Sequence, residues 1–301
     1  MKITPCVPIH LDILQKNNIK LFIKRDDLTH PLVSGNKWRK MKYNILEAKN
    51  LGFETLLTFG GAFSNHIHAT AAVGQTFGFK TIGIIRGEAA SISNSTLSSC
   101  IQMGMQLHFI SRSDYKLKNN SDFQKQLVKK FGKCYIVPEG GTNTFAVKGC
   151  AEIITETIPQ IDAKIDYWTV GCGTGGTASG MILGTKNKSK VIAFSALKGD
   201  FHKNDIKNLI NDDKLNHWEV NTDYHFGGFA RYKPELVEFI NNFKKETNIQ
   251  LEPIYNGKML FGVFDLIKKG YFPRDSTIVA IHTGGLQGIK GFNERYGNLI
   301  S

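Results

Sequence analysis

The 301-residue chain is predicted to have an α/β fold in which mostly parallel, twisted sheets carry helices on both faces. Short β-branched or aromatic runs alternate with helical patterns along almost the whole chain, and several of these patterns end in glycine. Three strand candidates are followed by turns that lead into helices, at 59–66, 170–180 and 281–288. Because ligands of such folds gather at the carboxyl ends of strands, these turns predict the site.

The strand candidates are rich in β-branched and aromatic residues, which suit a buried sheet. In chain order they are KLFIK (20–24), TLLTF (55–59), KTIGIIR (80–86), LHFIS (107–111), CYIVP (134–138), DYWTV (166–170), KVIAFSA (190–196) and TIVAIHT (277–283). The helical patterns are 37–50, 64–78, 95–104, 123–132, 145–158, 177–184, 233–246 and 257–269. The chain shows no internal repeat, low-complexity segment or clear linker.

The composition, 41% hydrophobic with 30 glycines and 8 prolines, is typical of a globular protein. The first residues, MKITPCVPIHLDILQK, lack the apolar core of a signal peptide, and no apolar run approaches the roughly 20 residues of a membrane helix. The five cysteines are scattered, with no C-x-x-C pair, which argues against disulfides and zinc. We therefore expect a cytoplasmic protein with no membrane partner and no metal.

A net charge of +12 raises the alternative of a nucleic-acid-binding protein. The lysines, however, are spread over many helical patterns and offset by nearby acids, as in KPELVEFINNFKKE. No arginine-rich stripe with interleaved aromatic residues is present. We expect no nucleic-acid partner, and a basic surface that steers anionic ligands.

The turn GCGTGGT (171–177) follows a strand candidate and opens a helix of small residues. Glycines allow positive φ and close approach of backbone N–H groups to an anion, and the helix N-terminus adds its dipole. This pattern predicts a phosphate-binding loop, while a plain tight turn remains the alternative. It is not a P-loop, since no Lys-Ser/Thr follows, and it lacks the acidic residue of a dinucleotide-binding fingerprint. The residues of this predicted phosphate loop are Gly173, Thr174, Gly175, Gly176 and Thr177.

SGNKWRK (34–40) places Lys37 directly after glycine and asparagine, so it is either the start of a solvated helix or a reactive lysine. A phosphate-bearing cofactor together with a lysine suggests pyridoxal 5′-phosphate, which forms a Schiff base with lysine. SGNKWRK, GGAFSNH, VPEGGTN, GTGGT, EPIYNGK and IHTGG occur in the order seen in one family, over about residues 20–290. The chain resembles the 1-aminocyclopropane-1-carboxylate deaminase / D-cysteine desulfhydrase family of fold type II, tryptophan-synthase-β-like enzymes.

The resemblance implies a large cofactor domain, 1–39 and 149–301, with a small domain, 40–148, inserted between. It implies that the site lies between the two domains, that the substrate is a small amino acid, and that the protein is a homodimer. Lys37 is then the Schiff-base lysine and removes the substrate α-proton, which requires a neutral amine. Arg39, Lys40 and Lys42 are expected on a solvated helix face, and Asn36 either bonds to the cofactor or shapes the turn.

GGAFSNH leads into a helix whose first N–H groups suit a substrate carboxylate. By resemblance, Ser64 binds that carboxylate and handles a proton, while Asn65 bonds to the cofactor's ring oxygen; helix capping is the alternative and is compatible with binding. His66 stands where a glutamine or another polar residue is sometimes found, and it is grouped with Ser64, Asn65 and Tyr255 as a substrate-binding residue. His68, two positions later, cannot share its helix face, so no metal pair is expected.

Tyr255 in EPIYNGK is implied to bind the substrate and to protonate a leaving group, although packing is the alternative. Thr283 in IHTGG matches the hydroxyl residue that reaches the pyridine nitrogen in desulfhydrase-type relatives. The chain departs from deaminases proper at Asn256 and Thr283, where they carry glutamate and leucine. A second family tyrosine appears as Phe229, which Tyr232 could replace only in a differently shaped loop.

These departures favour β-elimination from D-cysteine, giving pyruvate, ammonia and sulfide, over the ring opening of 1-aminocyclopropane-1-carboxylate to 2-oxobutyrate and ammonia. Three further alternatives stay open. They are a nicotinamide-dependent oxidoreductase, which the missing acidic residue disfavours, a basic nucleic-acid-binding protein, and a cofactor-binding protein without lyase activity.

Overall fold

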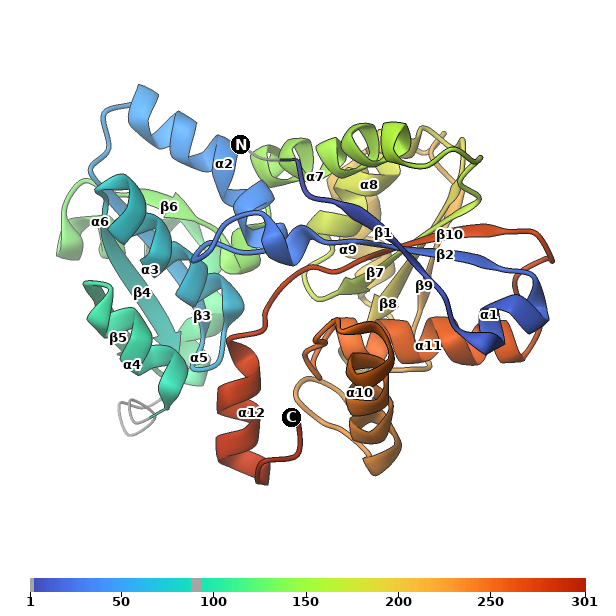
Figure 1. Cartoon of the computed structure of the whole chain (residues 1–301). Coiled ribbons are helices and arrows are strands. Elements are labelled where there is room, and N and C mark those ends of the chain that lie inside the picture. Colours follow the sequence, from blue (N-terminus) through green and yellow to red (C-terminus); the bar gives the residue numbers. More distant parts are fainter. Residues whose placement is uncertain (1–2, 88–93) are drawn as a thin grey trace.

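The computed structural model describes residues 3–87 and 94–301, which form two mostly parallel sheets flanked by helices (Figure 1). The larger sheet has the strand order β1-β2-β10-β7-β8-β9 and the smaller one β5-β4-β3-β6. In the larger sheet β1 runs antiparallel to β2, and the other pairings of both sheets are parallel. The predicted α/β class is therefore confirmed.

The strands are β1 (Cys6–Ile9), β2 (Lys20–Lys24), β3 (Thr55–Gly61), β4 (Lys80–Arg86), β5 (Met105–Ile110), β6 (Tyr135–Val137), β7 (Tyr167–Cys172), β8 (Lys190–Ser195), β9 (Trp218–Asn221) and β10 (Thr277–Ile281). The α-helices are α1 (Asp12–Asn17), α2 (Asn36–Asn50), α3 (Asn65–Phe77), α4 (Ser95–Gln102), α5 (Arg112–Tyr115), α6 (Ser121–Phe131), α7 (Thr144–Thr157), α8 (Gly176–Thr185), α9 (His202–Ile210), α10 (Pro234–Thr247), α11 (Asn256–Lys268) and α12 (Gly288–Tyr296). Four short 3₁₀ helices are η1 (Asp26–Leu28), η3 (Lys116–Asn119), η4 (Glu139–Gly141) and η5 (Ile158–Gln160).

All eight strand candidates coincide with observed strands, and the two that the sequence missed, β1 and β9, lie at the edges of the larger sheet. A strand at the edge of a sheet needs less apolar side-chain surface than a central strand. β1 also contains Pro8, which is tolerated at an edge because an edge strand leaves N–H groups unpaired. Neither strand has the buried run typical of a central strand. The short helices α1, α5, α9 and α12 were missed as well.

The larger sheet is apolar on both faces, as a parallel sheet covered by helices must be. On β10, Ile278 and Ala280 join the core formed with α10 and α11, while Val279 and Ile281 face the core under α7, α8 and α9. Figure 1 shows α7 and α8 on one side of this sheet and α10 and α11 on the other. This double burial explains the continuous hydrophobic run TIVAI.

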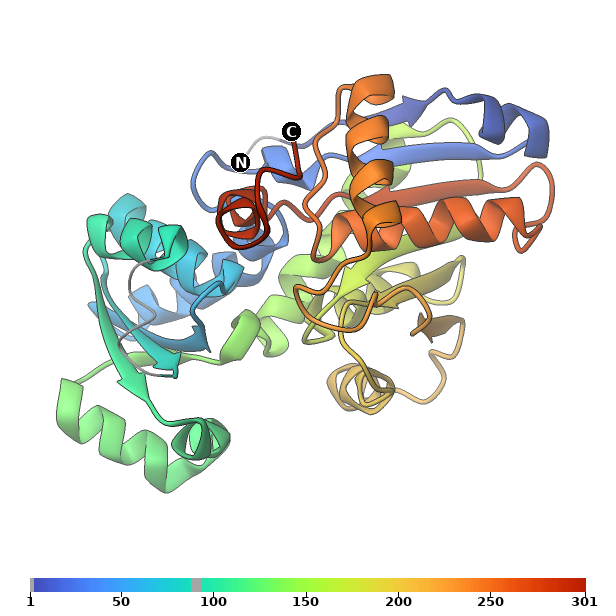
Figure 2. The ribbon, with the colours of Figure 1, turned by 90° about the horizontal axis from the view of Figure 1, so that it is seen from below.

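The smaller sheet is covered by α2, α3 and α4 on one face and by α5 and α6 on the other. Figures 1 and 2 show the two sheets at opposite ends of the molecule, and α7 packs against both α2 and α8 between them. The C-terminal helix α12 packs against α4. Because the four strands of the smaller sheet are parallel, their carboxyl ends lie on one edge, which is where the predicted turn after β3 begins.

A buried ion pair joins α2 to the first 3₁₀ helix and to α7. Arg39, predicted on a solvated helix face, is fully buried, and its Nη2 donates to Asp26 and to Glu156, at 2.8 Å each. These contacts hold the pKa of Arg39 above its ordinary value despite burial. The prediction was wrong for Arg39 because its side of α2 packs against α7 and the first 3₁₀ helix, so this side chain does not reach solvent. Lys42 is partly exposed and pairs with Glu152 at 2.7 Å.

Replacing Arg39 with alanine should lower the free energy of unfolding by about 3–5 kcal/mol, because Asp26 would remain buried and unpaired. Lys42→Ala, which breaks a partly exposed pair, should cost less than about 1 kcal/mol. Urea unfolding of both variants without cofactor measures the difference. Equal losses would contradict the structural role assigned to the buried pair.

Candidate active site

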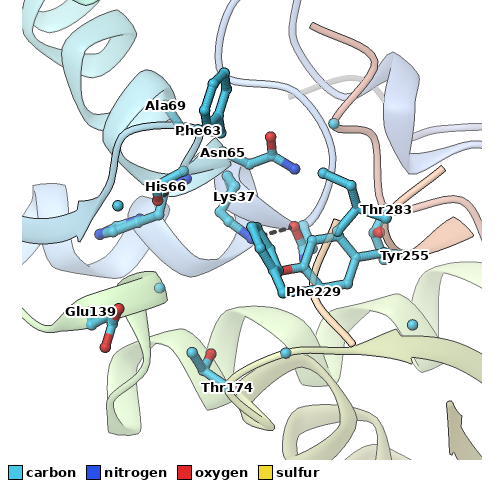
Figure 3. Close-up of a pocket in the computed structure, with 18 of the residues that line it drawn as sticks. Lys37, Phe63, Asn65, His66, Ala69, Glu139, Thr174, Phe229, Tyr255 and Thr283 are labelled. Carbon is cyan, nitrogen blue, oxygen red and sulfur yellow. Dashed lines mark hydrogen bonds between the residues drawn. The ribbon is translucent and has the colours of Figure 1, made fainter. Parts of the chain in front are cut away.

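A cavity of about 840 Å³ lies at the carboxyl ends of strands from both sheets. Its walls include the turns after β3, β7 and β10 and the first turn of α2, so it collects all three predicted turns. Figure 3 shows Lys37 in this cavity, with Asn65, Tyr255, Phe229 and Thr283 around it. The predicted site residues that line it are Lys37, Ser64, Asn65, His66, Gly173, Thr174, Gly175, Thr177, Tyr255 and Thr283.

Lys37 is held at the start of α2 by a tight contact with the end of β10. Gly35 has φ +68°, and a Cβ there would lie 1.9 Å from the carbonyl oxygen of Thr283, so only glycine fits. The Asn36 N–H donates to that carbonyl at 3.2 Å. The Asn36 side chain accepts from Lys37 Nζ at 3.0 Å and donates to Thr177 at 2.9 Å, linking the lysine to the phosphate loop.

Burial, with the nearby charge of Lys40 as the second cause, lowers the pKa of Lys37 from its ordinary 10.5 to about 7. A lysine with this pKa is largely neutral above pH 7 and can act as a nucleophile or a base. A neutral amine at working pH is the property that was predicted for a reactive Lys37.

The phosphate loop connects β7 to α8 and has no side-chain cap, so the first N–H groups of α8 remain free to bind an anion. Gly175 has φ +77°. A Cβ on Gly176 would lie 2.9 Å from Thr142 and 3.2 Å from Lys40 Nζ, and one on Gly173 would lie 3.1 Å from the Tyr255 ring. These glycines therefore leave backbone N–H groups open where side chains would fill the space.

Lys40 is the second correction to the predicted solvated face of α2. It is buried, and its Nζ donates to Gly140 O at 3.1 Å, to Thr142 at 3.0 Å and to Thr174 at 3.3 Å. Burial lowers its pKa. All three acceptors are neutral, and a buried cation is stabilised when an anion lies beside it. Since Lys40 is three residues after Lys37, the same helix face presents both amines.

Ser64 caps α3, with its Oγ accepting from the N–H groups of His66 at 3.2 Å and of Ile67 at 3.3 Å. Capping thus occurs: Ser64 Oγ satisfies the N–H groups of His66 and Ile67, and the Ser64 carbonyl accepts that of His68. The Asn65 Oδ1 accepts from Gln287 Nε2 at 2.9 Å, which ties the start of α3 to the turn after β10.

His66 is buried and bonds to the strand beneath it. Thr58 donates its hydroxyl hydrogen to Val137 O at 2.8 Å, so the 2.8 Å contact between Thr58 and His66 requires a proton on His66 Nε2. Burial and the charges of Lys37 and Lys40 hold the pKa of His66 well below its ordinary value. Figure 3 shows its ring directed away from Lys37. This orientation supports a packing role more than the substrate contact expected of His66.

Tyr255 lies at the start of α11, beneath Phe229, whose ring centroid is 6.2 Å from that of Tyr255. Burial raises the pKa of Tyr255, so its hydroxyl keeps its proton and can donate it. Glu252, which the sequence reasoning missed, is buried and accepts the N–H groups of Ile254, Tyr255 and Asn256. Its position three residues before Tyr255, at a helix start, was the available signal.

Asn256 fixes Thr283. Its Oδ1 accepts both the N–H of Thr283, at 2.9 Å, and the Thr283 hydroxyl, at 3.0 Å. Its Nδ2 donates to Gly284 O at 2.8 Å. Both the oxygen and the nitrogen of the Asn256 amide thus bond to the turn after β10, and the bond to the oxygen orients the Thr283 hydroxyl.

Phe229 sits on a loop that Lys258 holds in place. The buried Lys258 Nζ donates to the carbonyls of His225, at 2.9 Å, and Gly228, at 2.7 Å. Tyr232 packs edge-on against Phe292 and Tyr296 of α12 and does not line the cavity. Tyr232 therefore does not take the place of the missing second tyrosine.

Among the residues that the structure describes, no group of three His, Cys, Asp or Glu side chains could hold a metal ion. Within residues 3–87 and 94–301, no helix has both the length and the apolar character needed to cross a bilayer.

The fold and the site define an α/β enzyme in which a reactive lysine faces a loop suited to phosphate. The family model described as pyridoxal-phosphate dependent enzyme matches residues 2–284, and the chain belongs to this family, within the 1-aminocyclopropane-1-carboxylate deaminase / D-cysteine desulfhydrase group of fold type II. The resemblance and the cofactor class inferred from six short motifs are thereby confirmed.

The chain is 32% identical to the mitochondrial bifunctional D-cysteine desulfhydrase/1-aminocyclopropane-1-carboxylate deaminase of Arabidopsis thaliana, covering 91% of this chain and 74% of that protein. It is 28% identical to a Pyrococcus abyssi protein provisionally named 1-aminocyclopropane-1-carboxylate deaminase, covering 96% and 91%. The crystal structure of an ACC deaminase homologue superimposes with a TM-score of 0.87 at 26% identity, covering 100% of this chain and 94% of that one.

The residues of the cavity fit pyridoxal phosphate. The open glycine turn and the buried Lys40, surrounded by neutral acceptors, suit the phosphate group, and Lys37 has the lowered pKa that carrying the cofactor requires.

Replacing Gly176 with valine should lower the affinity for pyridoxal phosphate strongly, because the side chain would displace Thr142 and the Lys40 amine. Fluorescence titration of the cofactor-free protein measures this affinity. Gly52→Ala, at a positive φ with open space around it, controls for the loss of a glycine. Unchanged affinity in Gly176→Val would show that the phosphate binds elsewhere.

Lys40→Met should raise the pKa of Lys37 above 7, because it removes the positive charge that opposes protonation of Lys37. In the cofactor-free protein, an amine-acylating reagent followed by peptide mapping reports the neutral fraction of Lys37 against pH. The midpoint should lie near pH 7 in the wild type and higher in Lys40→Met. Lys42→Met, with its amine paired to Glu152, should leave the midpoint in place.

Proposed function

We propose that this enzyme is a D-cysteine desulfhydrase that releases sulfide, ammonia and pyruvate by β-elimination. The observation that carries the proposal is the hydrogen bonding of Asn256. Where deaminases proper have a carboxylate beside the tyrosine, this chain has an amide, and both of its ends bind the turn at Thr283 and Gly284. Asn256 therefore has no proton to exchange with a substrate.

The carboxylate of Glu252, near Tyr255, is also occupied by hydrogen bonds to the backbone. Glu252 accepts three backbone N–H groups at 2.6–2.8 Å, which favours a structural role for it. The position of the second family tyrosine carries Phe229, which has no hydroxyl. Opening a cyclopropane ring needs more acid–base help than expelling a thiolate, so this set of residues supports elimination.

Four residues have separate roles in the proposed reaction. When bound, pyridoxal phosphate withdraws electrons from the α-carbon of the amino acid. Lys37 carries the cofactor and, as a neutral amine, takes the α-proton at Nζ. Ser64, whose oxygen accepts two N–H groups of α3, donates its hydroxyl hydrogen to the substrate carboxylate, and Asn65 orients the cofactor ring. Tyr255 gives its hydroxyl proton to the departing sulfur.

Thr283 would face the pyridine nitrogen of the cofactor, and its hydroxyl hydrogen, which is donated to Asn256 Oδ1 in this structure, would turn to that nitrogen when the cofactor is bound. A neutral hydroxyl makes the ring a weaker electron sink than a carboxylate would, and weak withdrawal suffices when the leaving group departs readily. The phosphate is assigned to Gly173, Thr174, Gly175, Gly176 and Thr177, with Lys40 adding its charge.

We also infer the domain limits 1–39 with 149–301 and 40–148, a homodimer and a cytoplasmic location. The strands of the smaller sheet all fall between residues 55 and 137, and those of the larger sheet fall outside this range, which supports the limits. Residues 1–2 and 88–93 lie outside the described part of the chain. The five cysteines are free, which supports a reducing compartment.

The purified enzyme should release sulfide and pyruvate in equal amounts from D-cysteine and no 2-oxobutyrate from 1-aminocyclopropane-1-carboxylate. Tyr255→Phe should slow turnover by about 10²–10⁴-fold through loss of the proton donor, without releasing cofactor. Tyr232→Phe, which changes a tyrosine packed on α12, is the matched control and should keep full activity. 2-Oxobutyrate formation without sulfide would reverse the assignment.

A further inference from the structure

The cavity extends past the proposed catalytic residues along the carboxyl edge of the smaller sheet. Three cations and one carboxylate line this extension: Arg86 at the end of β4, Arg112 and Lys118 just after β5, and Glu139 after β6. Figure 3 shows Glu139 well apart from Tyr255 and Thr283, on the side of the cavity that His66 faces. None of these four residues has a part in the elimination proposed above.

Tyr115 organises this cluster. It is buried, and its hydroxyl donates to Glu139 Oε1 at 2.7 Å. Two cations lie near its ring, with Arg86 Cζ 5.5 Å and Lys118 Nζ 5.2 Å from the ring centroid. Cation–π contacts of this kind hold charged groups in place while leaving their N–H donors available.

The charges of the cluster do not balance. Glu139 lies 3.5 Å from Lys118 and compensates one cation. Within the part of the chain that the structure describes, Arg86 and Arg112 contact no carboxylate. Both arginines are exposed at the wall of the cavity, so their guanidinium groups are free to bind an anion from solution.

Arg86 also lies close to the turn that carries Ser64. Its β4 position pairs with Gly61, the last residue of β3, and a Cβ on Gly61 would lie 3.5 Å from Arg86 Nη2. That distance is an ordinary van der Waals contact, so the guanidinium of Arg86 lies directly beside the backbone of Gly61. The cationic wall therefore begins within one turn of the proposed carboxylate site.

We propose that Arg86 and Arg112 form a subsite for a second negative charge, a carboxylate or phosphate ester on the side chain of the bound amino acid. The inference rests on the proposed function to the extent that Ser64 receives the α-carboxylate and so directs the side chain. Arginine suits both anions because its planar fork donates two parallel hydrogen bonds. General attraction of anions by a basic cavity would also favour the more negative amino acid, but it would depend on Arg295 of another wall as much as on Arg86 and Arg112.

The test is calorimetric titration of the cofactor-loaded enzyme with matched pairs of amino acids that carry no thiol. D-Aspartate is compared with D-asparagine, which has nearly the same shape without the charge, and O-phospho-D-serine with D-serine. The charged member of at least one pair should bind about tenfold more tightly at low salt, with the advantage shrinking at high salt. The pair that shows the larger ratio identifies the anion that the subsite prefers.

In Arg86→Gln/Arg112→Gln the ratio of dissociation constants should fall to about one, because both unpaired guanidinium groups are gone. Arg295→Gln is the matched control, since Arg295 is an exposed arginine on α12 that lines the same cavity from another wall. It should retain the ratio. The proposal is overturned if the wild type binds both members of each pair equally. It is also overturned if the ratio of dissociation constants persists in the double variant, or if Arg295→Gln lowers that ratio as much as the double variant does.

The titrations with D-aspartate and D-asparagine are independent of turnover, because neither side chain carries a β-leaving group, and a phosphate assay shows whether O-phospho-D-serine is consumed during its titration. An enzyme that binds the dianionic amino acids preferentially yet releases no sulfide from D-cysteine would leave the subsite standing and remove the desulfhydrase assignment. The opposite result, sulfide release without charge preference, would remove the subsite alone.

Discussion

The contact between Gly35 and the carbonyl group of Thr283 is the constraint on which the rest of the site depends. It brings the residue before α2 against the end of β10, two segments about 250 residues apart in sequence. Lys37 follows this contact closely, and Thr283 belongs to it, so one backbone approach sets the positions of the lysine proposed to carry the cofactor and of the hydroxyl proposed to face its ring. Only glycine can make the approach, because any Cβ would overlap the carbonyl oxygen and φ is positive. The hydrogen bonds of Asn36 then extend the same constraint to Thr177 of the phosphate loop.

The helical spacing of α2 gives each of its cations a different task. Lys37 and Lys40, three residues apart, face the cavity, whereas Arg39 turns toward Asp26 and Glu156 in the interior and Lys42 toward Glu152 near the surface. Lys40 is close enough to lower the pKa of Lys37 and close enough to Thr174 to supply charge to the phosphate loop. In the proposed mechanism Lys37 is a neutral base and Lys40 is a cation that binds phosphate. The two lysines therefore need opposite protonation states, although they lie on the same turn of α2.

The sequence predicted the sheets well because a parallel strand buried on both faces needs a continuous apolar run, and such runs are visible in TIVAI or KTIGIIR. It predicted the turns around Lys37, Ser64 and Gly175 because glycine at the end of a strand usually marks positive φ or a close backbone approach. It failed for Arg39 and Lys40, since a charged helix is normally expected to be solvated, and whether its charges are buried depends on partners more than 100 residues away, such as Glu156 and Thr142. Glu252 was missed as part of the site for the same reason, and although Asn256 was singled out, its hydrogen bonds to the turn after β10 could not be predicted from the sequence.

The residue at position 256 is central to the proposed choice between elimination and ring opening, because asparagine is one methylene shorter than glutamate and carries an amide in place of the carboxylate. A glutamate there would bring a proton and a charge next to Tyr255, but it could not donate to the carbonyl of Gly284 as the asparagine amide does. Asparagine instead uses its oxygen to bind the N–H and hydroxyl of Thr283 and its nitrogen to bind Gly284, so it stabilises the turn and takes no part in proton transfer. Phe229, whose ring lies against Tyr255, has no hydroxyl, so Tyr255 is the acid–base group at this end of the cavity. Burial raises the pKa of Tyr255, so its hydroxyl keeps its proton at neutral pH. A site with one base and one acid is matched to a substrate whose leaving group departs as a stable anion.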